Sequence, residues 1–303
     1  MAFVGLYRYR VIRALWVPFM VVSWRSRTLR AIRILPAVLL GVASVLGFLG
    51  VGVTSAQAMP NSPSSCSGGV IAPGSYGSLT VTGTCFVPQG SVVIHGNLTL
   101  APGSLLDAVS PAPPAPTGSE LPGDVYVSGN VIVGQGAALG LGCSPSICTD
   151  STNDSVGGNL VANQALAVIV HGVTVGGSVA VTGGGGGVTC APPPLFDTDP
   201  QLAGNPAYGD FENNVIRGNL TVTGLKSCWF GALRDQIGGS FVYNNNTFAD
   251  PDANENLNST INGSMICVGN SPAVQFGDSA ASPNVVRGAA IGQCAYPISV
   301  RPS

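Results

Sequence analysis

One short unit recurs along the chain: an aliphatic residue, a spacer, glycine, asparagine or serine, and a second aliphatic residue. It reads Ile-His-Gly-Asn-Leu at 94–98, and the segments 127–131 and 216–220 follow the same pattern. A unit this short cannot bury its apolar side until a neighbouring copy stacks on it. The repeat therefore predicts a solenoid, in which each copy forms part of one rung.

Two apolar columns accompany the repeat glycines, whose intervals are 19, 33, 29, 19, 41, 21, 24 and 25 residues. One column stands two residues after each glycine, and the other stands two residues before it, where Ser75 is the exception. Spacing by two places side chains on one face of an extended strand, so stacked rungs would join each column into a continuous core. The first column consists of Leu79, Leu98, Val131, Leu160, Val179, Leu220, Phe241, Met265 and Ala290.

Glycine followed by asparagine or serine suits a corner between two short strands. Glycine supplies backbone freedom or the lack of a side chain, and the polar side chain after it can hydrogen-bond nearby backbone. The pattern resembles the parallel β-helix of secreted bacterial proteins over residues 74–292, in architecture and not in any catalytic family. The resemblance implies an all-β parallel β-helix, or β-solenoid, with rungs of about 19–25 residues, extruded loops and polar ladders at the corners. The alternative is a β-sandwich with glycine-rich turns.

The first 58 residues have the order of a targeting segment. Four arginines precede an uncharged apolar run at 34–53, and Ala-Gln-Ala follows as a small-residue cleavage site before Met59. We therefore expect a signal peptide over 1–58, whose long leader suggests that translation begins at Met20. The alternative is an uncleaved membrane anchor, since about 20 apolar residues can span a bilayer.

Charge is distributed unevenly between the leader and the rest of the chain. Seven of the twelve basic residues and none of the fourteen acidic residues precede residue 59, so 59–303 carries five basic and fourteen acidic groups, a net charge of −9. Nucleic acid is an improbable partner, because its phosphates require a basic footprint. We expect one β-solenoid domain over 59–303, interrupted by insertions near 101–123, 183–213 and 244–258.

The eight cysteines all follow residue 59. An even number of cysteines in an exported chain predicts disulfides, and rung spacing favours pairs that are close in sequence. A zinc site is disfavoured because no second close cysteine pair or nearby histidine accompanies Cys143 and Cys148. The predicted pairs are Cys66 with Cys85, Cys143 with Cys148, Cys190 with Cys228, and Cys267 with Cys294.

One acidic loop is a candidate calcium site, and calcium is the sole cofactor that the sequence suggests. Asp250, Asp252 and Glu255 alternate with other residues on a short segment, and carboxylate oxygens are ligands that Ca²⁺ accepts. The loop lacks the glycine of an EF-hand, and the alternative is a solvated acidic turn.

Several residues are candidates for binding a sugar polymer. Arg217 and Arg287 share the position before the repeat glycine, which His95 also occupies, and Trp229 follows Cys228. Further aromatic candidates are Tyr126, Phe230 and Tyr243.

Polysaccharide lyases and hydrolases with this architecture use clustered acids on an outward sheet face. No pair of carboxylates in this chain recurs at a spacing that stacking would bring together, and no motif of a hydrolase or metalloprotease is present. We therefore expect an exported surface or extracellular scaffold or adhesion protein without catalytic activity, secreted or held at a bacterial cell surface. Its partners would be cell-wall or extracellular polysaccharide, or surface proteins. The alternatives are a polysaccharide-binding module and a polysaccharide lyase or hydrolase on the same scaffold.

Overall fold

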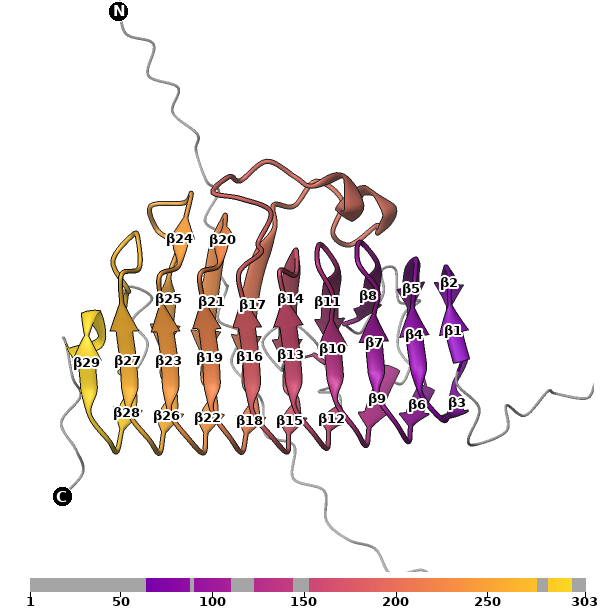
Figure 1. The fold of residues 1–303 in the computed structure, drawn as a ribbon, viewed down its shortest axis with the longest axis horizontal. Coiled ribbons are helices and arrows are strands. Elements are labelled where there is room, and N and C mark those ends of the chain that lie inside the picture. The colour runs from indigo at the N-terminus through magenta and orange to yellow at the C-terminus, as the bar shows by residue number, and fades with distance from the viewer. Residues whose placement is uncertain (1–63, 88–89, 110–122, 144–152, 277–282, 296–303) are drawn as a thin grey trace, which may run out of the picture. The chain divides into compact units, whose positions relative to one another are not determined.

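The protein is a coil of short strands stacked into parallel sheets (Figure 1). The computed structural model describes residues 64–87, 90–109, 123–143, 153–276 and 283–295. Three large sheets, which we call A, B and C, run along the coil, and each rung contributes to them in turn. All described strand pairs are parallel. The parallel β-helix is therefore confirmed, and the β-sandwich, whose sheets are antiparallel, is excluded.

Sheet A carries the first apolar column in the predicted register. Leu98 pairs with Val131, which pairs with Leu160, and the pairing continues to Ala290. Along these strands buried residues alternate with more exposed ones, as expected where one sheet face meets the core. The strands are β1 (Ser64–Cys66), β4 (Leu79–Val81), β7 (Leu98–Leu100), β10 (Val131–Val133), β13 (Leu160–Asn163), β16 (Val179–Thr182), β19 (Leu220–Thr223), β23 (Phe241–Asn244), β27 (Met265–Val268) and β29 (Ala290–Gly292).

Sheet C carries the second apolar column. Ile94 pairs with Val127, which pairs with Val156. In the first rung Tyr76, and not Ser75, is the partner of Ile94, because the corner after it is one residue shorter than in the next rung. The strands are β3 (Gly74–Tyr76), β6 (Gly90–Ile94), β9 (Gly123–Val127), β12 (Ser155–Val156), β15 (Thr174–Val175), β18 (Val215–Ile216), β22 (Gln236–Ile237), β26 (Thr260–Ile261) and β28 (Val285–Val286).

Sheet B differs from the other two because several of its strands are buried on both faces. Every residue of β8, β11 and β14 is buried. Sheet B contains β2 (Gly69–Val70), β5 (Thr84–Phe86), β8 (Leu105–Ala108), β11 (Ala138–Leu141), β14 (Ala167–His171), β17 (Tyr208–Glu212), β21 (Trp229–Leu233) and β25 (Glu255–Leu257), and a small fourth sheet pairs β20 (Lys226–Ser227) with β24 (Thr247–Phe248).

The repeat glycine and the residue after it form a ladder at the corner between sheets C and A. The Asn130 backbone N–H donates to Asn97 Oδ1 at 2.8 Å, and the Asn159 backbone N–H donates to Asn130 Oδ1 at 2.9 Å. A Cβ on Gly129 would collide with Asn97 Oδ1 and with the Gly96 carbonyl oxygen. Glycine is therefore required because the neighbouring rung occupies the space that a side chain would need.

The corner between sheets B and C and the corner between sheets A and B, which is the third corner, contain buried polar ladders that the repeat motif does not predict. The Asn214 backbone N–H donates to Asp235 Oδ1 at 2.9 Å, and the Asp235 N–H donates to Ser259 Oγ at 3.0 Å. At the third corner the Asn246 N–H donates to Asn270 Oδ1 at 3.1 Å. These bonds give partners to backbone donors that the turns would otherwise leave buried and unpaired.

Three of the four predicted disulfides are present. Cα atoms are 6.4 Å apart in Cys66–Cys85, 4.6 Å in Cys190–Cys228 and 5.1 Å in Cys267–Cys294. Cys143 is also disulfide-bonded, and Cys148, its predicted partner, lies outside the described residues. Disulfides persist in oxidising compartments, so these bonds are compatible with an extracellular protein.

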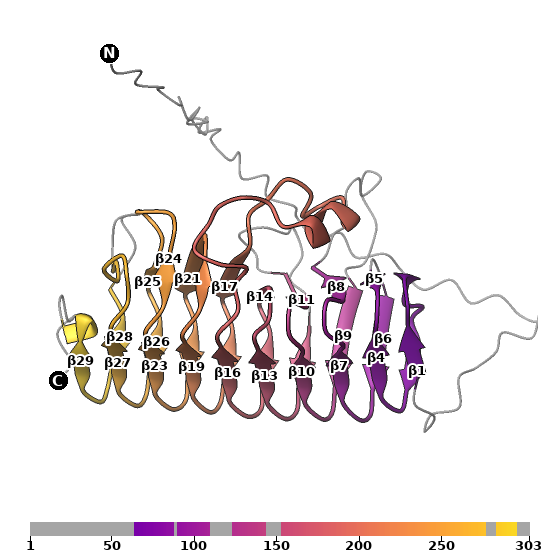
Figure 2. The ribbon, with the colours of Figure 1, turned by 45° about the horizontal axis from the view of Figure 1, so that its top comes forward.

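The segment between β16 and β17, residues 183–207, leaves the coil and lies across the outer face of sheet B (Figures 1 and 2). We call it the strap. The strap contains a short 3-10 helix, η1 (Pro194–Thr198). A second 3-10 helix, η2 (Gln293–Ala295), lies at the end of the described residues. The predicted insertion near 183–213 thus comprises the strap and β17, while the ranges near 101–123 and 244–258 contain strands of the coil, β8 in one and β24 and β25 in the other.

None of the helices in the described part of the chain has the length and apolar character needed to cross a membrane. The apolar run at 34–53 lies outside the described residues.

Candidate functional site

An open groove follows the outer face of sheet C. It consists of two adjoining hollows of about 460 and 360 Å³, and Arg217 lines both of them. The floor includes Gly157, Gly176 and Gly238, so the backbone lies bare between the larger side chains. We call this groove, from Tyr126 at one end to Arg287 at the other, the sheet C groove.

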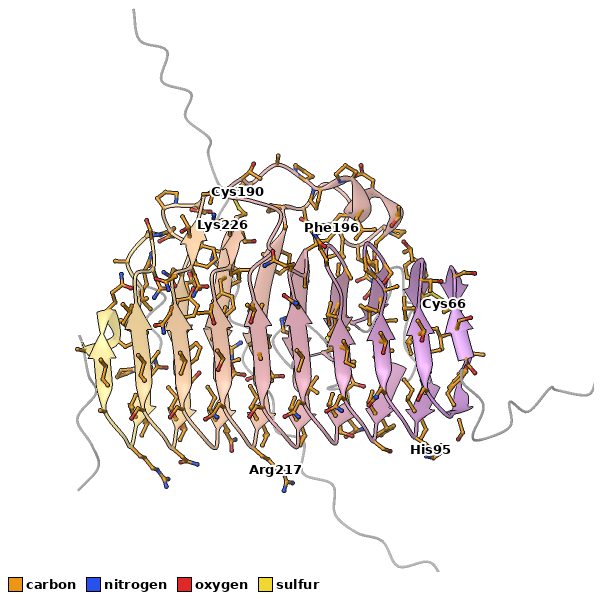
Figure 3. The ribbon with its side chains drawn as sticks, in the orientation of Figure 1. Cys66, His95, Cys190, Phe196, Arg217 and Lys226 are labelled. Carbon is orange, nitrogen blue, oxygen red and sulfur yellow. A yellow bond between two sulfur atoms is a disulfide. The ribbon has the colours of Figure 1, made fainter. Side chains whose placement is uncertain are left out.

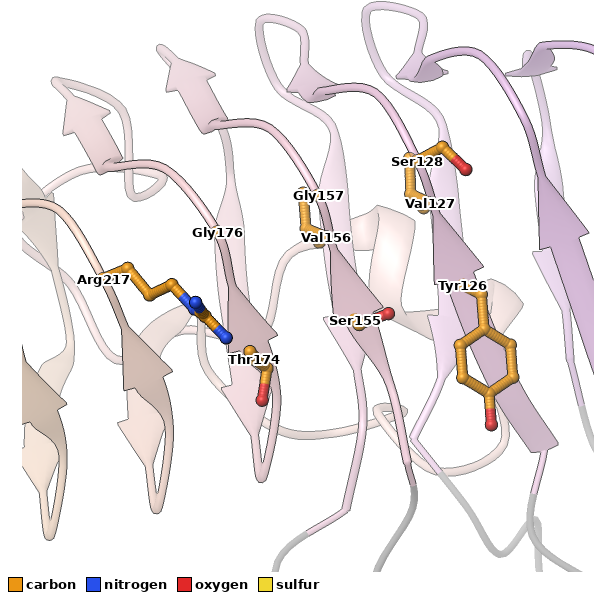
Figure 4. A pocket seen from close by; sticks show the side chains of 9 residues that line it. All are labelled: Tyr126, Val127, Ser128, Ser155, Val156, Gly157, Thr174, Gly176 and Arg217. Carbon is orange, nitrogen blue, oxygen red and sulfur yellow. The ribbon is translucent and has the colours of Figure 1, made fainter.

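Side chains of different chemistry stand at intervals along the sheet C groove. Figure 4 shows Arg217 and Tyr126 at opposite ends of the first hollow, with Thr174 and Ser155 between them. Tyr126 on β9 lies three strands from β18, which precedes Arg217, and three more strands lead to β28, which precedes Arg287. With strands 4.7–4.9 Å apart, each step is about 14 Å. The steps along the coil are therefore equal, but Tyr126 is in register with Val215, two residues before Arg217, while the two arginines share one repeat position.

The sheet C groove is poor in acids although the chain is acidic overall. Asp124 is the one acidic residue in the described strands of sheet C, and the Tyr126 hydroxyl donates to it at 3.4 Å. Arg217 and Arg287 both line the groove, as the shared repeat position predicts. Arg217 and His95 project from the same edge of the coil (Figure 3).

The strap covers the outer face of sheet B over β8, β11 and β14. Phe196 of η1 is 0% exposed and packs with Leu105, Ala138 and Ala167. The Cys190–Cys228 disulfide ties the start of the strap to the residue before β21. These contacts explain why the covered strands are buried on both faces.

A cavity of about 170 Å³ remains between the strap and sheet B, and we call it the strap cavity. Part of its wall is apolar, including Ile169, Leu139 and Leu202. Its polar lining residues are Asp107, His171, Gln201, Asn205 and Tyr208.

Two carboxyl groups meet at the strap cavity. Asp199 of the strap is 0% exposed and lies beside Asp107 of β8. Gln201 is hydrogen-bonded to both carboxyl groups. Its backbone N–H donates to Asp199 Oδ1 at 2.7 Å, and its Nε2 donates to Asp107 Oδ2 at 3.0 Å. Burial, and then the negative charge of Asp199, raise the pKa of Asp107 to about 7. Asp199 Oδ2 is buried without a donor, and a proton held between the two carboxyls would supply one.

A buried His–Asp pair lies on the neighbouring strands. His171 Nε2 is 2.9 Å from Asp210 Oδ2. In the neutral form of His171, Nε2 donates its proton to the carboxylate and Nδ1 is an acceptor, for which the described residues supply no hydrogen-bond donor. Burial raises the pKa of Asp210, and the hydrogen bond and charge of His171 oppose this. Beside the pair, Glu212 forms an ion pair with Arg234.

Tyr208 stands between these two pairs as a neutral hydroxyl. Burial raises the pKa of Tyr208 to about 12, and the charges of Asp210 and Asp107 add to the effect. Its ring packs edge-on against Trp229, with ring centroids 6.3 Å apart.

Trp229 lies away from the two arginines with which the sequence grouped it. It belongs to β21 of sheet B and packs on Tyr208, whereas Arg217 and Arg287 line the sheet C groove. Of the other aromatic candidates, Phe230 and Tyr243 are 0% exposed in the core with ring centroids 5.1 Å apart. Tyr126 alone among them reaches the sheet C groove.

The candidate calcium residues are not gathered around one point. Asp250 Oδ1 accepts the Asp252 backbone N–H at 2.9 Å, Asp252 Oδ1 accepts from Gln275 at 3.2 Å, and Glu255 begins β25. Within the described ranges, the one group of three whose ligand atoms lie within 4.8 Å of one another is His171, Asp210 and Glu212. Arg234 already pairs with Glu212 there, and its charge opposes a cation.

The carboxyl pair of Asp107 and Asp199 is a feature that repeat spacing does not predict. Asp199 lies in the strap, so stacking of rungs says nothing about where it falls. One sequence signal does point to a covered face: the run Ala-Val-Ile-Val at 167–170 lacks the polar alternation of an exposed strand. The strap was predicted as an insertion, but its docking on sheet B was not.

Comparison with known proteins adds no relative: no family model matches the chain, and neither a curated protein nor a solved structure matches it. The resemblance to parallel β-helix proteins is therefore one of architecture.

Proposed function

We propose that this protein is an exported extracellular scaffold that binds a linear acidic polysaccharide along the sheet C groove, without cleaving it. The observation that carries the proposal is that Tyr126, Arg217 and Arg287 stand three strands apart along one open face. A periodic row of side chains suits a periodic ligand. The disulfides and the leader at 1–58 support export.

The chemistry of the row favours a sugar polymer with carboxylates. An arginine guanidinium pairs with a carboxylate through two parallel hydrogen bonds. A tyrosine ring offers an apolar face on which a sugar ring can lie, and threonine and serine hydroxyls between them can bond to sugar hydroxyls. Because glycine residues and bare backbone form the floor of the groove, an extended polysaccharide can approach it closely.

Calorimetric titration with a linear polyuronate, beside an uncharged linear glucan, tests the proposal. We expect the polyuronate to bind and the glucan to bind at least tenfold more weakly. The double substitution Arg217→Gln and Arg287→Gln should weaken polyuronate binding at least tenfold, which is about 1.4 kcal/mol. Binding should also weaken in 1 M salt, where the screening length falls to about 3 Å.

Lys226→Gln is the matched control, because Lys226 is exposed but belongs to β20, outside sheet C. It should leave binding unchanged. Equal binding of the glucan, or full binding by the double variant, would refute the proposed ligand. Release of new reducing ends from the polymer would show that the protein is an enzyme.

A further inference from the structure

At the strap cavity, two acceptors have no donor among the described residues. One is Asp199 Oδ2, which lies beside Asp107, whose own two oxygens accept from the Val109 N–H and from Gln201 Nε2. His171 also lines the cavity, is 3% exposed, and has Nδ1 free to accept. A buried acceptor left without a partner destabilises the folded state. A ligand that brings donors to these atoms would recover that free energy.

Among the described residues, no lysine or arginine lines the strap cavity around Asp107. The titratable groups that face it are Asp199 from the strap, Tyr208 from β17 and His171 from β14. Neutral His171 donates its one ring proton to Asp210. In the described part of the chain, Arg234 is engaged with Glu212. A cationic ligand is therefore the complement of this end of the cavity.

The floor between the two acceptors is open because of a glycine. Gly140 on β11 lies opposite Asp107, and on β14 Ile169 is in register with Gly140, with His171 two residues further along. A Cβ on Gly140 would lie 2.9 Å from Val109 Cγ2 and 3.6 Å from Asp107 Oδ1, so any side chain here would fill the space. Asp107 and His171 come from strands two rungs apart, or about 9.5 Å.

We propose that the strap cavity binds a small aliphatic ammonium ion that carries a second hydrogen-bond donor at its far end. The ammonium group pairs with Asp107 and displaces the proton held between Asp107 and Asp199. The second donor reaches His171 Nδ1, and the aliphatic stem lies over Gly140 and against Ile169. At about 30 Å³ for each non-hydrogen atom, by analogy with the liquid volume of water, the 170 Å³ cavity holds about six such atoms.

The probe with these properties is 4-amino-1-butanol, and its matched controls are 1,4-butanediol, which lacks the charge, and butylamine, which lacks the second donor. Calorimetry on the full chain at pH 8 should give millimolar binding of the amino alcohol. The diol should bind at least tenfold more weakly, and butylamine several-fold more weakly. Because the ammonium group requires ionised Asp107, affinity should fall about tenfold per pH unit below about 7, where binding should release up to one proton, whereas at pH 8 it should release almost none.

Asp107→Asn should abolish binding of the amino alcohol and its pH dependence, and Asp124→Asn in sheet C should change neither. Asn keeps the shape of the protonated acid, so the variant should fold. If the variant does not fold, the pH dependence of binding and the proton release measured on the wild-type chain still test the proposal. Three outcomes would overturn the proposal: equal binding of the diol, binding below pH 7 without proton release, or binding that persists in Asp107→Asn. Saturation of the cavity by Ca²⁺ or Zn²⁺ that blocks the amino alcohol would reassign it as a metal site.

Discussion

The outer faces of sheets B and C are built from the same rungs, yet they have opposite surroundings. The sheet C face is open, poor in acids and lined by arginine, tyrosine and glycine. The sheet B face lies under the strap and contains four acidic residues in the region of the strap cavity: Asp107, Asp199, Asp210 and Glu212. Repetition sets the positions of the strands, and what covers a face then decides the chemistry available there.

Solvent access explains the contrast in protonation. Burial raises the pKa of Asp107 and of Asp210 under the strap, because a charged carboxylate loses its hydration. The arginine side chains on the open face are exposed and can meet a large ligand from solution. The open face therefore suits a polymer, while the covered face suits a small molecule.

The largest effect is expected for Phe196→Ala, which removes the aromatic anchor of the strap. Truncating a fully buried phenylalanine costs about 3–5 kcal/mol, and Phe196 is 0% exposed. Denaturant unfolding, with hydrogen exchange along β11 and β14, should show lost stability and lost protection of sheet B. The matched change Tyr126→Ala on the open face should alter stability by less than about 0.5 kcal/mol. Equal costs would mean that the strap does not shield sheet B.

Stability should also depend on pH through Asp107. Its pKa is raised to about 7 in the folded protein from 3.8, so between these values the folded state binds more protons than the unfolded state. This contribution to the free energy of unfolding is therefore present at low pH and is lost as pH rises toward 7, with a slope of at most about 1.4 kcal/mol per pH unit.

Comparing the unfolding free energies of the wild type and Asp107→Asn from pH 4 to 8 would isolate this slope. The difference between them should change with pH and level off above about 7. A difference that stays constant would show that Asp107 ionises normally under the strap.

Two glycine-to-alanine substitutions, one on each face, should lower stability by less than Phe196→Ala and by different amounts. A Cβ on Gly157 of the sheet C groove would collide with the backbone carbonyl of Ser128, whereas one on Gly140 would meet the movable Val109 side chain. Gly157→Ala should therefore destabilise by about 1–3 kcal/mol. Gly140→Ala should cost less and should reduce the volume of the strap cavity. Melting temperatures of the two variants compare them, and the reverse order would contradict this packing.

The smallest effect is expected for Arg217→Gln. Its side chain lines an open groove, and surface substitutions of this kind change stability by less than about 0.5 kcal/mol. Chemical denaturation should give an unchanged midpoint, so any loss of polyuronate binding in this variant would report on the groove itself. A clear shift of the midpoint would assign Arg217 a structural role.

Much of the coil was determined by the sequence itself. Stacking needs the same apolar side chain on the same face in each rung, so the column from Leu79 to Ala290 could be identified from spacing by two. The corner asparagines could be identified too, because Asn97 and Asn130 bond to backbone that is fixed by the repeat. The pairs Cys66–Cys85, Cys190–Cys228 and Cys267–Cys294 followed from closeness along the rungs.

The tertiary structure alone decided what lies outside the repeat. The strap contains no copy of the unit, so neither its path over sheet B nor the meeting of Asp199 with Asp107 follows from rung spacing. The same holds for Trp229, which sequence proximity could not assign to sheet B, away from Arg217. Local patterns determine strands because each rung contacts only its neighbours. A loop that crosses several rungs is positioned by long-range packing, which in this protein is the burial of Phe196.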